Sequence, residues 1–140
     1  MPSIFTRIID GEIPGTFVWR DPDCVAFLSI APMMPGHTLV VPREEIDHWI
    51  DLEPALARHL FAVAQTIGKA QDAAFSPRRI GVMIVGDDVP HVHIHLVPIN
   101  SAGELSFAHA DPNPPEGALD DAAARLRAAL RDQGATEVAD

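Results

Sequence analysis

The sequence predicts an α+β fold: an antiparallel sheet of about five strands with one long covering helix, followed by a C-terminal helix. Apolar residues recur at near-helical spacing through residues 52–75, which predicts a long amphipathic helix. Short apolar runs bounded by turn residues lie before and after this segment, as is typical of strands. A second helical pattern lies near the end of the chain.

Five strands are expected. In chain order they are residues 16–19, 24–30, 37–41, 80–85 and 89–98. Residues 21–23 form a hairpin connection between the first two, and Gly86 begins a tight turn between the last two. Pro42 ends the third strand, because proline cannot donate to a β-ladder. The run 80–85 is almost continuously apolar, which predicts a buried strand.

Three helices are expected. Ser3 can cap a short helix that reaches about Asp10. Asp51 is a candidate N-cap for the long helix, which Ser76 and Pro77 end. The last helix gathers its apolar residues on one face: Leu119, Ala122, Ala123, Leu126 and Leu130.

The chain divides into a main domain at residues 3–108 and a C-terminal extension with one helix at 109–140. Residues 100–117 are rich in Ser, Gly, Asn and Pro, so this connection is expected to be largely irregular.

The composition limits the kinds of partner and compartment. A formal charge of −10 and a pI near 4.9 argue against nucleic acid or an anionic membrane as the main partner. A single cysteine, Cys24, excludes an internal disulfide and any multi-cysteine zinc site. No signal-like or membrane-spanning apolar run is present, which favours a cytoplasmic protein.

Three histidines alternate with aliphatic residues in the segment 91–97. In a strand this period of two would place His91, His93 and His95 on one face, opposite the aliphatic residues. A single strand histidine is more often a structural residue. Three in register indicate a functional site, because such a row lowers β-propensity and requires partners for six ring nitrogens.

Clustered imidazoles serve either metal binding or nucleophilic and acid–base catalysis. Along a flat strand His91 and His95 would be about 13 Å apart, whereas Zn–N bonds measure only about 2.0–2.1 Å. One metal ion could therefore use a neighbouring pair but hardly all three. A row of imidazoles acting on one phosphate, its leaving group and the attacking water would use every histidine.

The segment 91–97 resembles the His-φ-His-φ-His-φ-φ signature of the histidine triad superfamily of nucleotide hydrolases and transferases, where φ is an apolar residue. Three further blocks resemble the same family in the same order: residues 4–14, 26–32 and 35–42. The resemblance covers roughly residues 3–100. It implies an enzyme of the phosphoramidase or phosphoanhydride hydrolase type, a homodimer, and no metal ion or other cofactor in catalysis.

The resemblance also implies residue roles. His93 would be the nucleophile that attacks the α-phosphate of a nucleotide conjugate and forms a covalent nucleotidyl-histidine. His95 would contact the phosphate or leaving group, while His91 and the separate His37 would support and orient the site. The nucleotide-binding set implied for the base and ribose comprises Phe5, Ile8, Phe27, Ser29, Ile30, Asp88 and Val89.

This sequence departs from the family pattern at two places. Ser29 stands where phosphoramidase-type members usually carry an Asp that holds the ribose hydroxyls. The loop 86–90 is short, with Asp87 and Asp88 in place of neutral hydrogen-bonding residues. Both changes are expected to alter substrate preference more than the chemistry.

Two alternatives remain open from the residues. The first is a nucleotide-binding protein with little turnover, which Ser29 and the acidic loop favour. The second is a metal-dependent hydrolase that uses a His-x-His pair, although no carboxylate ligand stands at motif spacing. His48, His59 and His109 match no pattern and are expected on the surface.

Overall fold

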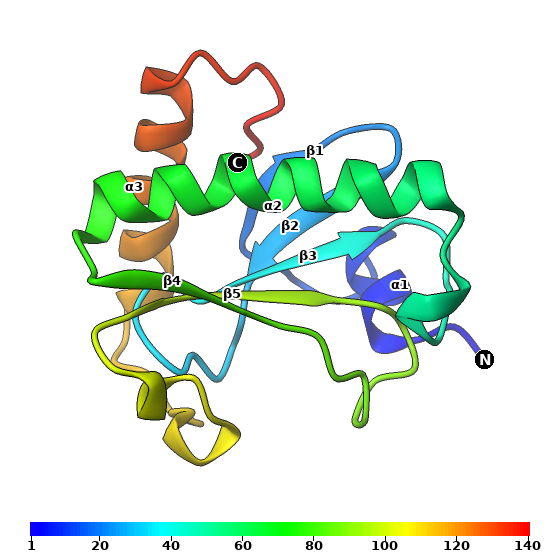
Figure 1. Ribbon diagram of the computed structural model, residues 1–140, viewed down its shortest axis with the longest axis horizontal. Coiled ribbons are helices and arrows are strands. Elements are labelled where there is room, and N and C mark those ends of the chain that lie inside the picture. Colours follow the sequence, from blue (N-terminus) through cyan, green and yellow to red (C-terminus); the bar gives the residue numbers. More distant parts are fainter.

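The computed structural model describes all 140 residues, Met1–Asp140. Its centre is a five-stranded antiparallel sheet with the strand order β1-β2-β3-β5-β4 (Figure 1). The strands are β1 (Phe17–Arg20), β2 (Cys24–Leu28), β3 (Thr38–Pro42), β4 (Arg79–Met83) and β5 (Ile94–Ile99). The α+β fold expected from the sequence is confirmed.

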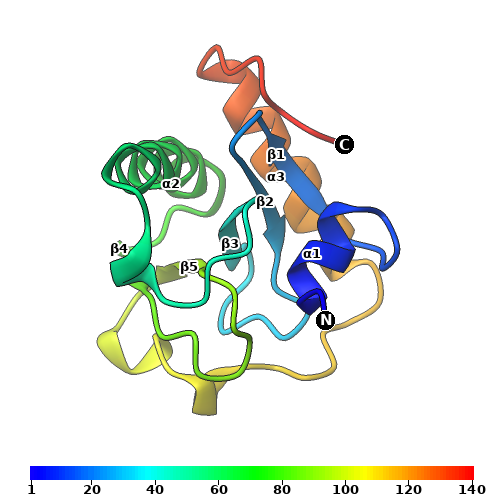
Figure 2. The ribbon, with the colours of Figure 1, turned by 90° about the vertical axis from the view of Figure 1, so that its right-hand side faces the viewer.

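Three α-helices accompany the sheet: α1 (Ile4–Ile9), α2 (Pro54–Phe75) and α3 (Ala118–Asp132). Short 3-10 turns occur at Trp49–Asp51, Ala102–Glu104 and Phe107–His109. Helices α2 and α3 contact each other and pack on one face of the sheet, while α1 lies on the other side (Figure 2). No helix is both long and apolar enough to cross a lipid bilayer.

The helix starts follow local capping rules. The side chain of Ser3 accepts a hydrogen bond from the Thr6 amide, so the predicted cap of α1 is confirmed. The predicted cap at Asp51 is wrong: α2 has its N-cap at Glu53, with Pro54 in the first turn. Proline favours extended backbone in the residue before it, and Glu53 has φ −56° and ψ 136°.

The main core lies between the sheet and the pair α2–α3. Leu60 and Ile67 of α2 and Leu126 and Leu130 of α3 are all fully buried in it. The end of the chain also returns to the sheet, where the Ala139 amide donates to Val18 O at 3.1 Å. Residues 109–140 therefore complete the main core as well as one edge of the sheet.

The opposite face of the sheet carries a smaller apolar cluster beneath α1. Its buried members are Phe5, Phe17, Val25, Phe27, Leu39, Val41 and Ala139. Along β2 the side chains alternate between the clusters, with Ala26 in the main core and Phe27 in this one. Three of its members, Phe5, Phe27 and Leu39, line the cavity described below.

Two strand predictions need correction. The strand 80–85 is not buried: β4 pairs only with β5, forms an edge of the sheet, and leaves Val82 51% exposed. The predicted strand 89–98 begins only at Ile94. Upstream of Ile94 the backbone bonds outside the sheet, with the His91 amide donating to Val89 O and the Val92 amide to Ile46 O.

Candidate active site

A cavity of about 490 Å³ opens between α1, β2, β3 and the start of β5. His37, His93 and His95 line it, whereas His91 lies behind it and is fully buried. All seven residues of the expected nucleotide-binding set also line this cavity: Phe5, Ile8, Phe27, Ser29, Ile30, Asp88 and Val89. The volume is within the usual range for a small-molecule site.

His93 presents one free ring nitrogen. Its Nδ1 lies 2.7 Å from the backbone oxygen of His91, and because a carbonyl can only accept, Nδ1 carries the proton. The lone pair of Nε2 is therefore available to attack an electrophile. The ring of Phe5 packs edge-to-face against the imidazole at 4.8 Å between centroids, which fixes the ring position.

A directional hydrogen-bond chain runs through the other two cavity histidines. The Met33 amide donates to His37 Nδ1 at 3.0 Å, so His37 carries its proton on Nε2. That nitrogen lies 2.9 Å from His95 Nδ1 and donates to it. The remaining proton of neutral His95 is therefore on Nε2, which is buried and has no partner within the protein. The chain ends at an unused N–H donor of a residue that lines the cavity.

Burial keeps these two rings neutral. Desolvation, with added repulsion from His95, lowers the pKa of His37 from 6.5 to about 3. Desolvation, followed by repulsion from His93, lowers the pKa of His95 to about 4. Neutral rings match the tautomers that the hydrogen bonds require, so the donor and acceptor pattern holds at neutral pH.

His91 does not line the cavity, and its hydrogen bonds hold neighbouring segments of the chain in place. Its Nε2 donates to Pro42 O at 2.8 Å, and its Nδ1 accepts from Ser3 Oγ at 2.7 Å. Glu45 extends this network, because its carboxylate accepts from the Ser3 amide and from the Thr6 hydroxyl. Burial lowers the pKa of His91. These bonds fix the start of α1, the end of β3 and the backbone that precedes His93.

The expected nucleotide-binding residues differ in character. Phe5 and Phe27 are buried and pack edge-to-face at 5.5 Å, so they form a rigid wall. Ile30 is 76% exposed and lies at the open side of the cavity. The Ser29 hydroxyl accepts from the Ala31 amide at 3.2 Å, and Asp88 is an exposed acid at the rim.

The sequence did not indicate two cavity neighbours. Phe107 packs edge-to-face on His95 at 5.6 Å, although it comes from the segment expected to be irregular. Its short 3-10 turn is capped by Ser106, a signal that the sequence contains but that is weak by itself. The sequence gives no indication of the role of Met33, because this residue contributes its backbone amide rather than its side chain.

Gly36 and Gln71 position the loop that carries His37. Gly36 has φ +90°, and a Cβ there would lie 2.5 Å from the ring of Phe75, so only glycine fits without a shift. Gln71, fully buried on α2, donates through Nε2 to Gly36 O and Leu96 O, both at 2.9 Å. One side chain thus joins the backbones next to His37 and His95.

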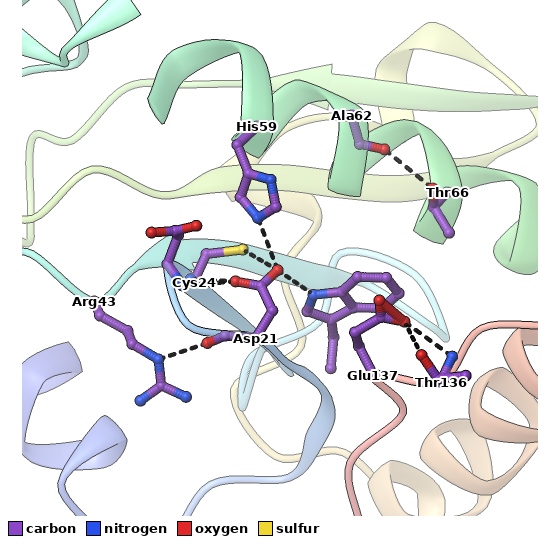
Figure 3. Close-up of polar contacts among 10 residues, drawn as sticks. Asp21, Cys24, Arg43, His59, Ala62, Thr66, Thr136 and Glu137 are labelled. Carbon is purple, nitrogen blue, oxygen red and sulfur yellow. Dashed lines mark hydrogen bonds and ion pairs between the residues drawn. The ribbon is translucent and has the colours of Figure 1, made fainter. Parts of the chain in front are cut away.

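The side chains that could hold a metal ion gather away from this cavity. Asp21, Cys24 and His59 offer ligand atoms that all lie within 4.8 Å of one another (Figure 3). His59 lies at the surface as expected, with its side chain 37% exposed, but it also bonds to Asp21, a contact that the sequence did not indicate. His48 and His109 are exposed as expected.

The fold and the buried histidine cluster define a histidine triad protein, and the comparisons agree. The HIT domain family model matches residues 10–102. The protein hit of Bacillus subtilis is 33% identical over 122 residues, which span 81% of this chain and 84% of that protein. This chain belongs to the HIT family.

Two solved structures share nearly the whole fold. A Hit-like protein involved in cell-cycle regulation from Bartonella henselae has a TM-score of 0.80 and 31% identity, covering 91% of this chain and 95% of that chain. A zinc-bound histidine triad family protein from Mycobacterium smegmatis has a TM-score of 0.81 and 27% identity, covering 94% of each chain. The similarity therefore extends beyond residue 102 into the C-terminal helix.

Proposed function

We propose that this protein is a nucleotide hydrolase or transferase that cleaves nucleotide conjugates at the α-phosphate through a covalent intermediate on His93. The observation that carries the proposal is the pairing of a free His93 Nε2 lone pair with an unused His95 Nε2–H donor on one cavity. The first can form a bond to phosphorus, and the second can stabilise charge on a phosphate oxygen.

The reaction would proceed in two displacements. In the first, His93 Nε2 attacks the α-phosphorus, the P–N bond forms, and the leaving group departs with the electrons of its bond and takes a proton from water. The hydrogen bond from Nδ1 to His91 O stabilises the positive charge that the modified ring acquires. In the second, water or another acceptor attacks phosphorus and releases a proton to solvent, which replaces the proton taken by the leaving group. The P–N bond breaks, and His93 recovers its lone pair.

We assign nucleotide binding to the apolar residues and Ser29 of the same cavity. The apolar surface of Ile8, Phe27 and Ile30 suits a purine or similar base, and Ser29 would face the ribose. Asp88 at the rim disfavours additional negative charge, which favours substrates whose leaving group is neutral. The net charge of −10 gives no long-range attraction for an anion, so binding depends on these local groups.

The decisive experiment is intact-mass analysis after mixing the protein with a panel of nucleoside phosphoramidates and dinucleoside polyphosphates. We expect a nucleotidyl adduct on the wild type and none on His93→Ala, with turnover of the variant lowered at least about 10³-fold. Nucleotide affinity should change little, because a nucleophile acts mainly in the transition state. His109→Ala, an exposed histidine, is the matched control. Turnover of His93→Ala within a few-fold of wild type would refute the mechanism.

A nucleotide-binding protein with little turnover is the second candidate. Ser29 at the expected ribose position and Asp88 on the rim favour it. It predicts tight binding of a nucleoside monophosphate without any adduct or product, so the same experiment separates the two candidates.

A metal-dependent hydrolase built on the triad is the third. Both ring nitrogens of His91 and Nδ1 of His93 and His95 already bond to protein atoms, so a metal ion would have to use His93 Nε2 and His95 Nε2. Binding at His95 Nε2 would also require that nitrogen to lose its proton, which reverses the hydrogen bond from His37. Activity lost in a chelator and restored by Zn²⁺, with no adduct on His93, would favour this reading.

We also propose that the protein is a homodimer. Strand β4 offers unpaired backbone groups along its outer side, and an open groove of about 530 Å³ runs between it and α2. Phe61 and Val82 on this groove are 47% and 51% exposed. A second copy could cover both the strand edge and the apolar groove.

A further inference from the structure

A cluster with mixed ligand chemistry lies where the β1–β2 hairpin meets α2. Asp21 comes from the hairpin turn, Cys24 begins β2, and His59 projects from α2 toward both (Figure 3). Their side chains supply a carboxylate oxygen, a sulfur and an imidazole nitrogen. These atoms come together from segments 38 residues apart in the chain, so neither turn chemistry nor helix periodicity alone accounts for the grouping.

The carboxylate of Asp21 is already oriented. Its Oδ1 accepts from the amides of Asp23 and Cys24, both at 2.8 Å, and Trp19 Nε1–H donates to its Oδ2 at 2.8 Å. The side chain is only 6% exposed. Donors of this kind around a ligating carboxylate hold it in one orientation and tune its basicity. Oδ2 is left facing Cys24 and His59.

The distances suit a small tetrahedral ion. His59 Nε2 lies 2.8 Å and Cys24 Sγ 3.4 Å from Asp21 Oδ2, and all three ligand atoms lie within 4.8 Å of one another. Bonds of about 2.0–2.3 Å at tetrahedral angles place neighbouring ligands roughly 3.3–3.8 Å apart. Half-exposed His59 can move by the remaining difference, since its ring is free on one side.

Charge also balances in such a site. The Cys24 thiolate and the Asp21 carboxylate would offset the two charges of a divalent cation, and His59 would bind as a neutral ligand. A sulfur, nitrogen and oxygen donor set favours a borderline-soft ion such as Zn²⁺ over Mg²⁺ or Ca²⁺. The exposed side of His59 provides the entry route and leaves a fourth position for water.

We propose that Asp21, Cys24 and His59 form a binding site for a zinc-like divalent cation that joins the β1–β2 hairpin to α2. The site is independent of the nucleotide chemistry, because Cys24 points into the main core under α2 while the cavity lies on the opposite face of the sheet. Its role is structural: a bound ion cross-links two elements that otherwise meet through side-chain packing and the Asp21–His59 contact.

The test is titration of the chelator-treated, full-length protein with Co²⁺. We expect one equivalent to bind, with a thiolate-to-cobalt charge-transfer band in the near ultraviolet and a rise in Tm that grows with free Co²⁺. Cys24→Ser should abolish the band. His59→Ala should weaken Co²⁺ binding by more than about tenfold, since even outer partners of ligands contribute 10–100-fold.

Controls locate the ion and check folding. His48→Ala, an exposed histidine outside the cluster, should titrate like the wild type. Circular dichroism of the metal-free variants establishes that Cys24→Ser and His59→Ala are folded. Absence of the charge-transfer band in the wild type would overturn the proposal. So would Co²⁺ binding that survives Cys24→Ser and is lost in His93→Ala, because the ion would then belong to the cavity histidines.

Discussion

The four histidines of the site each occupy a single tautomer, and hydrogen bonds to backbone atoms determine most of these tautomers. Pro42 O fixes His91, the carbonyl of His91 fixes His93, and the Met33 amide fixes His37 and through it His95. Backbone partners cannot be titrated or rotated away, so the acceptor on His93 and the donor on His95 are present before any ligand arrives. Such preorganisation is the larger part of electrostatic catalysis.

Ser29→Asp tests whether position 29 faces a ribose. The added carboxylate can keep the bond from the Ala31 amide with one oxygen and offer the other to a hydroxyl. A hydrogen bond to a charged group contributes roughly 1.5–3 kcal/mol, reduced here by repulsion from phosphate and Asp88. We expect a nucleoside monophosphate to bind about tenfold tighter, or about 1.4 kcal/mol, by calorimetry.

A 2′-deoxy analogue should gain much less on the same variant, because it lacks one acceptor-seeking hydroxyl. Ser101→Asp adds the same charge outside the cavity and should leave both affinities unchanged. Equal gains for both ligands, or weaker binding of both, would show that position 29 does not contact the ribose.

At this scale the sequence identifies side chains and misses their partners. The alternating pattern and the Pro-Gly-His-Thr block single out the four histidines. The sequence does not reveal that His37 and His95, 58 residues apart, share a hydrogen bond. Nor does it reveal that Ser3 bonds to His91 across 88 residues. Those contacts depend on tertiary packing, which no local pattern encodes.

Helix α2 does more than cover the sheet, because Gln71 connects it to the cavity backbone. Gln71→Leu would remove both bonds from Nε2 and leave Leu96 O and Gly36 O with fewer partners. The unpartnered Oε1 of Gln71 would disappear with them, which offsets part of the loss. We expect a net decrease of about 1–3 kcal/mol in the free energy of unfolding, measured by urea denaturation.

Gln133→Leu makes the same chemical change at an exposed position at the end of α3, outside the proposed dimer groove, and should stay within about 0.5 kcal/mol of wild type. An unchanged stability for Gln71→Leu would show that the amide bonds contribute nothing beyond the packing of an apolar side chain of similar size.

The periodicity of apolar residues predicts where the strands lie. It does not predict the residue at which backbone pairing begins or ends, or which strand lies at the edge of the sheet. An alternating run gives the same pattern whether or not its backbone is paired, so residues 91–93 were indistinguishable from β5. The apolar run of β4 predicts a buried strand, but burial inside the sheet and burial by another molecule produce the same composition. Sheet order, which decides the edge, is not a local property.

At the scale of the whole molecule, the buried histidines should bind protons less readily in the folded protein than in the unfolded chain. Burial lowers the pKa of His37 to about 3 and of His95 to about 4, whereas unfolded histidine titrates near 6.5. Between about pH 4 and 6.5 the unfolded state therefore binds more protons, and stability rises with pH. The stability is complete above about 6.5 and decreases as the pH falls toward 4.

Each buried histidine should contribute a slope of up to about 1.4 kcal/mol per pH unit in that window. Urea denaturation at intervals from pH 4.5 to 7.5 measures it. His37→Gln should lower the slope by up to about 1.4 kcal/mol per pH unit, which corresponds to one proton. His109→Ala, at a residue that is exposed in the native state, should leave the slope unchanged. A stability that does not change between pH 6.5 and 4.5 would mean that these rings are protonated in the folded protein.

One of the two edges of the sheet is left uncovered in the single chain. β1 is protected, since the chain end pairs beside it through Arg20, Val18 and Ala139. β4, at the other edge, has no such cover and carries exposed Val82 beside the open groove on α2. A long apolar edge is an aggregation hazard unless something pairs with it, and a second copy of the same chain satisfies both edges at once.

Light scattering at micromolar concentration should therefore give about twice the 15.1-kDa chain mass. Val82→Lys, which places a charge on the strand edge, should shift the protein to the monomer, since lysine blocks edge-to-edge pairing. Ile50→Lys adds the same charge at an exposed apolar residue outside the groove and should leave the mass unchanged. A monomeric wild type would exclude the dimer. A dimer that survives Val82→Lys would place the interface elsewhere on the molecule, and the apolar surface of β4 would then have another cause.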